Sequence, residues 1–111
     1  MGKALQIRVS AVTWNEDLLT ELWPQLSELA FGVPIKHERR GVREMVRALD
    51  EGLKFMDWPK ARCDYLRAGV ERAAAYKAQL EAALADWEPR EANRLSDALE
   101  DELDKLEAGY H

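Results

Sequence analysis

The sequence predicts a mainly α-helical protein that begins with one short β-strand. Three observations support this prediction: alternating apolar residues near the N-terminus, apolar residues at helical spacing along most of the remaining chain, and two Asp-Trp junctions that interrupt this spacing. With 111 residues, 47% hydrophobic and 33% charged, the chain has the size and composition of one globular domain. We expect residues 1–57 to form the strand and two medium helices. Residues 58–111 are expected to form a long antiparallel helical hairpin, which completes a small helical bundle.

Residues 4–12 alternate in the manner of a half-buried strand. The apolar positions include Leu5, Ile7 and Val9, and the polar positions are Gln6, Arg8 and Ser10. A lone strand leaves backbone donors and acceptors unpaired, and the other extended candidate, residues 33–36, contains Pro34. We therefore predict that the strand pairs with its copy in a homodimer. The alternatives are a loosely packed arm and an extension of the first helix.

The first helix is expected to follow Thr13 and to run for about five turns, and its apolar face is marked by Leu18, Leu19, Leu22, Leu26, Leu29 and Ala30. Thr13 and Glu16 have the spacing of a capping box at its start, with Glu16 in the first turn. Pro24 removes one backbone hydrogen bond and clashes with the preceding turn, so it predicts a kink or a break near Trp23.

Three further helices are expected. The second runs from residue 38 or 41 to about residue 56, and the third from Pro59 to Trp87, with apolar residues in steps of three and four. The fourth follows the Asp86-Trp87-Glu88-Pro89 junction and ends near Gly109. Because this junction is short, the third and fourth helices are expected to be antiparallel neighbours.

The N-terminal half carries a strand–helix–helix pattern. Its segments are Leu5-Gln6-Ile7-Arg8-Val9-Ser10, Leu18 to Gly32, and Arg40-Gly41-Val42-Arg43-Glu44-Met45-Val46. This pattern resembles the ribbon-helix-helix repressors and antitoxins, in which outward strand side chains enter the major groove of DNA. The resemblance implies that Gln6, Arg8 and Ser10 face bases. It also implies that Arg39, Arg40 and the second helix's N-terminus contact a phosphate.

Charge is segregated along the chain. A basic row is formed by Lys36, Arg39, Arg40, Arg43 and Arg47. We leave three interpretations of it open: a grip on phosphates or an acidic partner, a solvated helix face, and docking against the acidic last helix. The last helix carries Asp97, Glu100, Asp101, Glu102, Asp104 and Glu107. This pattern favours a solvated acidic face, with presentation of charge to a basic protein as the alternative.

No catalytic, cofactor or metal site is indicated. His37 and His111 lack the spacing of metal ligands, and Cys63 lies on an apolar stripe that favours an unreactive, packed thiol. A single cysteine fits a reducing compartment, and no apolar run approaches the roughly 20 residues that span a bilayer. We therefore expect a cytoplasmic protein with no membrane segment and no enzymatic activity.

Four tryptophans lie at or near the expected helix ends or breaks: Trp14, Trp23, Trp58 and Trp87. We expect Trp58 and Trp87 to cap the ends of the core, and leave core and interface roles open for the other two. The sequence as a whole favours a protein-interaction or assembly module that binds itself or another protein through its helical surfaces or its acidic last helix. The alternative is a DNA-binding regulator or antitoxin of ribbon-helix-helix type, with a C-terminal helical region for a partner.

Overall fold

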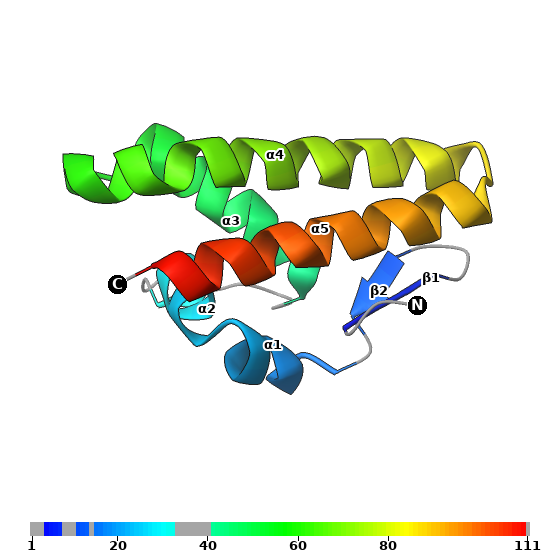
Figure 1. Ribbon diagram of the computed structural model, residues 1–111, viewed down its shortest axis with the longest axis horizontal. Coiled ribbons are helices and arrows are strands. Elements are labelled where there is room, and N and C mark those ends of the chain that lie inside the picture. Colours follow the sequence, from blue (N-terminus) through cyan, green and yellow to red (C-terminus); the bar gives the residue numbers. More distant parts are fainter. Residues whose placement is uncertain (1–3, 8–10, 14, 33–40, 111) are drawn as a thin grey trace.

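A computed structural model of the protein describes residues 4–7, 11–13, 15–32 and 41–110. Within them the chain is mainly helical, as predicted, and extends over 40 × 25 × 24 Å (Figure 1). The elements are β1 (Leu5–Ile7), β2 (Ala11–Thr13), α1 (Asp17–Leu22), α2 (Pro24–Phe31), α3 (Val42–Phe55), α4 (Lys60–Ala85) and α5 (Pro89–Gly109).

Helices α4 and α5 form the predicted antiparallel hairpin, which lies along the length of the molecule (Figure 1). Leucines at helical spacing on α5 are buried, among them Leu99 and Leu103. The helices approach closely at Gly69, where even a methyl group would overlap the side chain of Leu106. The hairpin is therefore the packed frame against which the remaining elements lie.

The α4–α5 turn is a Schellman motif. The amide of Glu88 donates to the carbonyl of Ala83 at 2.7 Å, and the amide of Trp87 donates to that of Leu84 at 3.1 Å. Trp87 adopts the left-handed conformation that this motif requires, with φ of 50°. A tryptophan thus occupies a position at which glycine is usual.

The single strand predicted over residues 4–12 is not seen. Instead β1 and β2 pair antiparallel with each other, with Leu5 opposite Thr13 and Ile7 opposite Ala11. The premise of the predicted dimer strand, that this segment finds no partner in its own chain, is therefore wrong for Leu5 and Ile7. Val9 lies outside the described residues.

The β-hairpin formed by β1 and β2 is fixed to α5 by a buried carboxylate. Glu100 is 2% exposed, and its Oε2 accepts hydrogen bonds from the amides of Ala4 at 2.8 Å and Leu5 at 3.1 Å. Amides that were expected to pair with a second copy are thus bonded within the chain. A buried amide without an acceptor is costly, so this contact decides where the N-terminal segment lies.

The break predicted at Trp23 is confirmed, since α1 ends at Leu22 and α2 starts at Pro24. The capping box predicted from Thr13 is wrong. Thr13 lies in β2, and its hydroxyl instead accepts from the amide of Val42 at 2.8 Å, at the start of α3. A hydroxyl can cap any helix start that it reaches in space, and here that is a helix 29 residues further along the chain.

The expectation that the acidic face of α5 is solvated is wrong for several residues. Glu100, Asp104 and Glu107 recur at helical spacing and face the N-terminal segments, where Asp104 Oδ1 accepts from Trp23 Nε1 at 2.9 Å. Glu102 is buried and accepts two hydrogen bonds from Arg72 of α4, at 3.0 and 3.1 Å. These bonds raise the pKa of the Arg72 guanidinium.

Glu107 caps α2 from outside. Its Oε1 accepts from the amides of Gln25 and Leu26, both at 3.0 Å, and its Oε2 accepts from the side chain of Gln25 at 2.8 Å. Free amides and the positive end of the helix dipole make a helix start a favourable place for a carboxylate. The carboxylates of Glu100, Asp104 and Glu107 therefore hold the N-terminal elements against α5. Asp97 and Asp101, on the same helix, remain exposed.

Candidate interaction site

The predicted basic row is only partly within the described residues. Arg43 lies 3.4 Å from Glu81 of α4, and the exposed Arg47 lies 3.1 Å from Glu51, one turn along α3. Both cations therefore have intrachain partners. Gln6 lies in β1 and pairs in register with Val12. The other predicted binding residues fall outside the described part of the chain, namely Arg8, Ser10, Lys36, Arg39 and Arg40.

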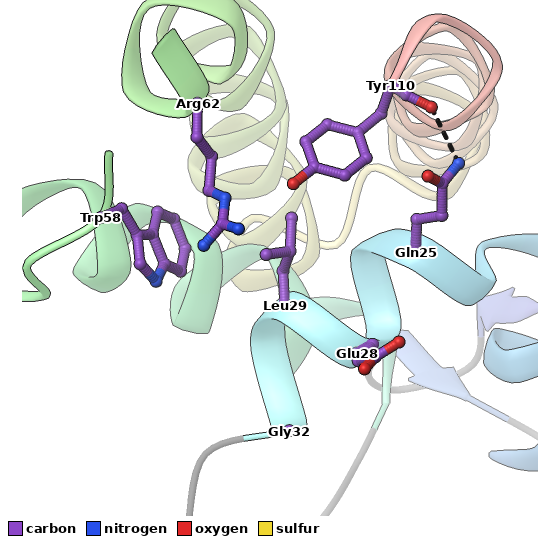
Figure 2. Close-up of a pocket in the computed structure, with 7 residues that line it drawn as sticks. All are labelled: Gln25, Glu28, Leu29, Gly32, Trp58, Arg62 and Tyr110. Carbon is purple, nitrogen blue, oxygen red and sulfur yellow. Dashed lines mark hydrogen bonds between the residues drawn. The ribbon is translucent and has the colours of Figure 1, made fainter. Parts of the chain in front are cut away.

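A pocket of about 430 Å³ lies where α2, the start of α4 and the end of α5 meet. Its lining residues are Gln25, Glu28, Leu29, Gly32, Trp58, Arg62 and Tyr110. Its volume is at the small end of the range for ligand sites, so it fits a side chain or a short peptide segment. Figure 2 shows Arg62 extending from α4 between the rings of Trp58 and Tyr110.

Two walls of this pocket are fixed by packing. The Trp58 ring lies against Gly52 of α3, where any side chain would overlap it. Tyr110 is held by its carbonyl, which accepts from the Gln25 side chain at 2.9 Å (Figure 2), and by Tyr65, whose ring centre lies 5.9 Å away. The aromatic walls are therefore positioned before any ligand arrives.

A second hollow of about 410 Å³ adjoins the first and shares Arg62 and Tyr110 with it. Tyr65 lines this second hollow, and its hydroxyl donates to the carbonyl of Leu106 at 3.1 Å. We call the two hollows together the arginine–aromatic groove. It is defined by Trp58, Arg62, Tyr65 and Tyr110.

Arg62 is the chemically distinctive residue of the groove. Its guanidinium carbon lies 5.8 Å from the centre of the Trp58 ring, within range of a cation–π interaction. Within the part of the chain that the structure describes, Arg62 forms no ion pair. Because the side chain is partly buried, an incoming carboxylate would meet a cation that has already lost some of its water.

Exposed apolar side chains gather beside the groove. Phe55 is 81% exposed and Met56 is 40% exposed, and they lie three and two positions before Trp58 in the chain. Tyr65, within the groove, is 41% exposed. Tryptophan, tyrosine, phenylalanine, methionine and arginine are the residue types most enriched in the centres of protein interfaces. This end of the molecule therefore has the composition of a binding surface.

The opposite end of the molecule carries one more exposed aromatic residue. Trp87, at the α4–α5 turn, is 56% exposed, so the prediction that it caps the core is wrong. Trp23, by contrast, is fully buried, and Trp14 lies outside the described residues.

The described residues do not assemble a metal centre. No group of three or more His, Cys, Asp and Glu among them has a geometry that could hold a metal ion. No helix in this part of the chain is both long enough and apolar enough to cross a bilayer. The Cys63 thiol is partly buried and lies 3.8 Å from the carbonyl of Trp58.

Sequence reasoning did not predict the groove. Trp58 and Tyr110 are 52 positions apart, and neither lies on a repeating apolar stripe that would predict their proximity. A usable signal was present in the Asp57-Trp58-Pro59 junction, where a large aromatic residue lies between two helices and next to Phe55 and Met56. Comparison of the chain with models of known protein families, with curated proteins and with solved structures found no match.

Proposed function

We propose that the protein is a non-enzymatic interaction module that binds another polypeptide in the arginine–aromatic groove. The observation that carries this proposal is the environment of Arg62, a partly buried cation between aromatic rings. Glu28 lines the same pocket, yet among the described residues no carboxylate forms an ion pair with Arg62. A peptide that brings a carboxylate and an apolar side chain would satisfy both features of the groove at once.

The exposed apolar residues beside the groove support the same proposal. Phe55 is largely in water at the end of α3, where burial by a partner would be favourable. Removing about 100 Å² of apolar surface from water contributes roughly 2.5 kcal/mol. A partner that covers Phe55 and Met56 as well as the groove therefore binds with a more favourable free energy than one that fills the groove alone.

Site-specific photo-crosslinking tests the proposal and captures the partner in the same experiment. A photoreactive phenylalanine analogue placed at Phe55 or at Tyr65 is expected to form a covalent adduct with a polypeptide inside cells. The same analogue at Ala78, on an exposed part of α4 away from the groove, is the matched control. Adducts that Arg62→Glu abolishes support the proposal. Equal yields from all three positions, or no adducts at all, would contradict it.

A cytoplasmic location is part of the proposal. Cys63 is the only cysteine, and a reducing compartment would keep its thiol free. Cell fractionation with trapping of free thiols tests this point. Recovery of the protein in an oxidised form outside the cytoplasm would contradict it.

The DNA-binding alternative remains a prediction and ranks second. Its ribbon would have to pair between two copies, whereas β1 pairs with β2 of its own chain. A mobility-shift assay with duplex DNA at low salt distinguishes the two functions, because phosphate contacts are strongest there. DNA binding that Arg8→Ala abolishes would favour the alternative over the interaction module.

A further inference from the structure

The side chains at the α4–α5 turn are complementary to the arginine–aromatic groove, which lies at the opposite end of α4. Trp87 is exposed and is flanked in sequence by Asp86 and Glu88, both of which are also exposed. Within the described residues, neither carboxylate forms an ion pair. We call these three residues the acidic tip. It presents one large aromatic side chain between two available carboxylates.

The backbone of the acidic tip is unfavourable for the residue that it carries. Trp87 has φ of 50°, and a non-glycine residue in this left-handed conformation is disfavoured by about 1 kcal/mol or more. Burial in the core does not offset this cost, because the side chain is 56% exposed. Glycine at this position would close the same Schellman motif without strain. The indole therefore has no structural explanation within the single chain.

We propose that the groove's partner is a second copy of this chain, whose acidic tip enters it. This inference rests on the function proposed above and names the occupant of that same groove. In this contact the Trp87 indole lies against Trp58 and Tyr110, and Asp86 or Glu88 pairs with Arg62. Arg62 and the two carboxylates lie at opposite ends of α4 and form no ion pair among the described residues, so in this contact they satisfy each other.

The acidic tip and the arginine–aromatic groove of one chain cannot contact each other. The 26 residues of α4 separate them by about 38 Å at 1.5 Å per residue, and Figure 1 shows the turn and the start of α4 at opposite ends of the bundle. Two copies that lie antiparallel make the contact twice and close a two-fold dimer. One buried tryptophan contributes only about 150–250 Å², far below the roughly 1,200 Å² of a stable interface, so a single contact binds weakly and the two contacts of the dimer reinforce each other.

Sedimentation velocity of the full chain and two variants tests this contact. Trp87→Gly removes the tip's indole and leaves the groove intact, whereas Arg62→Glu reverses the groove's charge and leaves the tip intact. The wild-type chain is expected to form a dimer whose population rises with concentration, and each variant alone is expected to be monomeric. A mixture of the two variants retains one contact, from the tip of Arg62→Glu to the groove of Trp87→Gly.

This mixture gives the most specific result. We expect a 1:1 complex that binds about 100-fold more weakly than the wild-type dimer, because one contact replaces two. The mixture is therefore measured at concentrations up to 100-fold above those at which the wild-type chain is fully dimeric. If it is still monomeric there, the proposal is overturned. A wild-type chain that stays monomeric throughout also overturns it. Circular dichroism of each variant checks that it is folded.

A second measurement avoids variants altogether. On dilution of the wild-type chain with labelled indole nitrogens, the NMR signals of Trp58 and Trp87 are expected to move together. The signal of Trp23, buried and bonded to Asp104, is the internal control and should not move. Stationary signals for Trp58 and Trp87 overturn the proposal. If the chain is monomeric but Phe55 still crosslinks to a different protein, the interaction module stands and only this occupant is rejected.

Discussion

The indole of Trp23 donates a hydrogen bond to the carboxylate of Asp104, across 81 residues of sequence, at 2.9 Å. Among the residues that the structure describes, Trp23 is the largest fully buried side chain, and it lies at the break between α1 and α2. The bond lets a broken helix place a bulky aromatic residue against α5 without leaving a buried donor unsatisfied.

Asp104→Leu is expected to lower the free energy of unfolding by about 1–3 kcal/mol, because the indole N–H of Trp23 then has no acceptor. Asp104→Asn retains an oxygen and should cost less. Urea unfolding followed by tryptophan fluorescence measures both changes. Asp101→Leu, at an exposed position three residues earlier on the same helix, is the control. An equal loss in the control would show that charge, and not the bond, is responsible.

Glu107→Ala is expected to destabilise the protein by about 1–2 kcal/mol, the usual cost of a lost helix cap, because the amides of Gln25 and Leu26 lose their acceptor. Hydrogen exchange measures this locally, and the amides of α2 should exchange faster while those of α4 change little. Asp97→Ala removes an exposed charge from the same helix and should leave α2 unaffected. Uniform acceleration across all helices would contradict a local capping role.

Gly69→Ala is expected to destabilise the hairpin by about 1–3 kcal/mol, although alanine is the better helix former, because its methyl group overlaps the Leu106 side chain. Leu106→Val in the same chain should relieve the overlap. A double-mutant cycle by thermal unfolding measures the coupling, and the paired variant should lose less than the sum of the single losses. Additive losses would mean that the two residues do not constrain each other.

Trp87→Gly is expected to leave the monomer as stable as the wild type, or more stable by about 1 kcal/mol, because glycine adopts φ of 50° without strain. Trp87→Ala removes the same indole but keeps the strained conformation, so it should show no gain. Unfolding at concentrations below dimerisation compares the two variants. If alanine and glycine behave alike, the strain at this turn is negligible.

Glu91 is expected to titrate below its ordinary pKa of 4.5, because hydrogen bonds from Arg94 favour the carboxylate. Since the folded-state pKa is the lower one, this pair stabilises the fold above pH 4.5, and the contribution disappears as the pH falls through the folded-state pKa. A carbon-detected NMR titration measures the shift. Arg94→Ala should return the pKa of Glu91 toward 4.5, whereas Arg90→Ala, at an exposed neighbour, should not.

The long helices were predictable because their signal is local and repeated. The leucines of α5 and the apolar row of α4 fix which face of each helix is buried, whatever lies opposite. Pro24 likewise marked the break at Trp23 by its own covalent geometry. The β-hairpin was missed because residues 8–10, between its strands, contain no glycine, proline or Asn-Gly pair of the kind that signals a tight turn.

The partners of polar residues were not predictable, since spacing gives the face of a helix but not what lies against it. Glu100, Asp104 and Glu107 have the same local pattern as a solvated acidic face, and only the fold shows that they reach amides and an indole about 80 to 96 residues away. The groove is hidden for the same reason. Arg62 and Tyr110 come together only after α4 and α5 have packed.

The anchoring of Ala4 by Glu100 also limits when the N-terminal segment can reach its final position during synthesis. These residues are 96 positions apart, so a ribosome releases the β-hairpin long before it has made the carboxylate that holds it. Until α5 has been made, α1, α2 and the β-hairpin cannot pack against it. Their apolar faces stay available to chaperones or to neighbouring nascent chains. The first strand can therefore be captured only after α5 has been synthesised and has emerged from the ribosome.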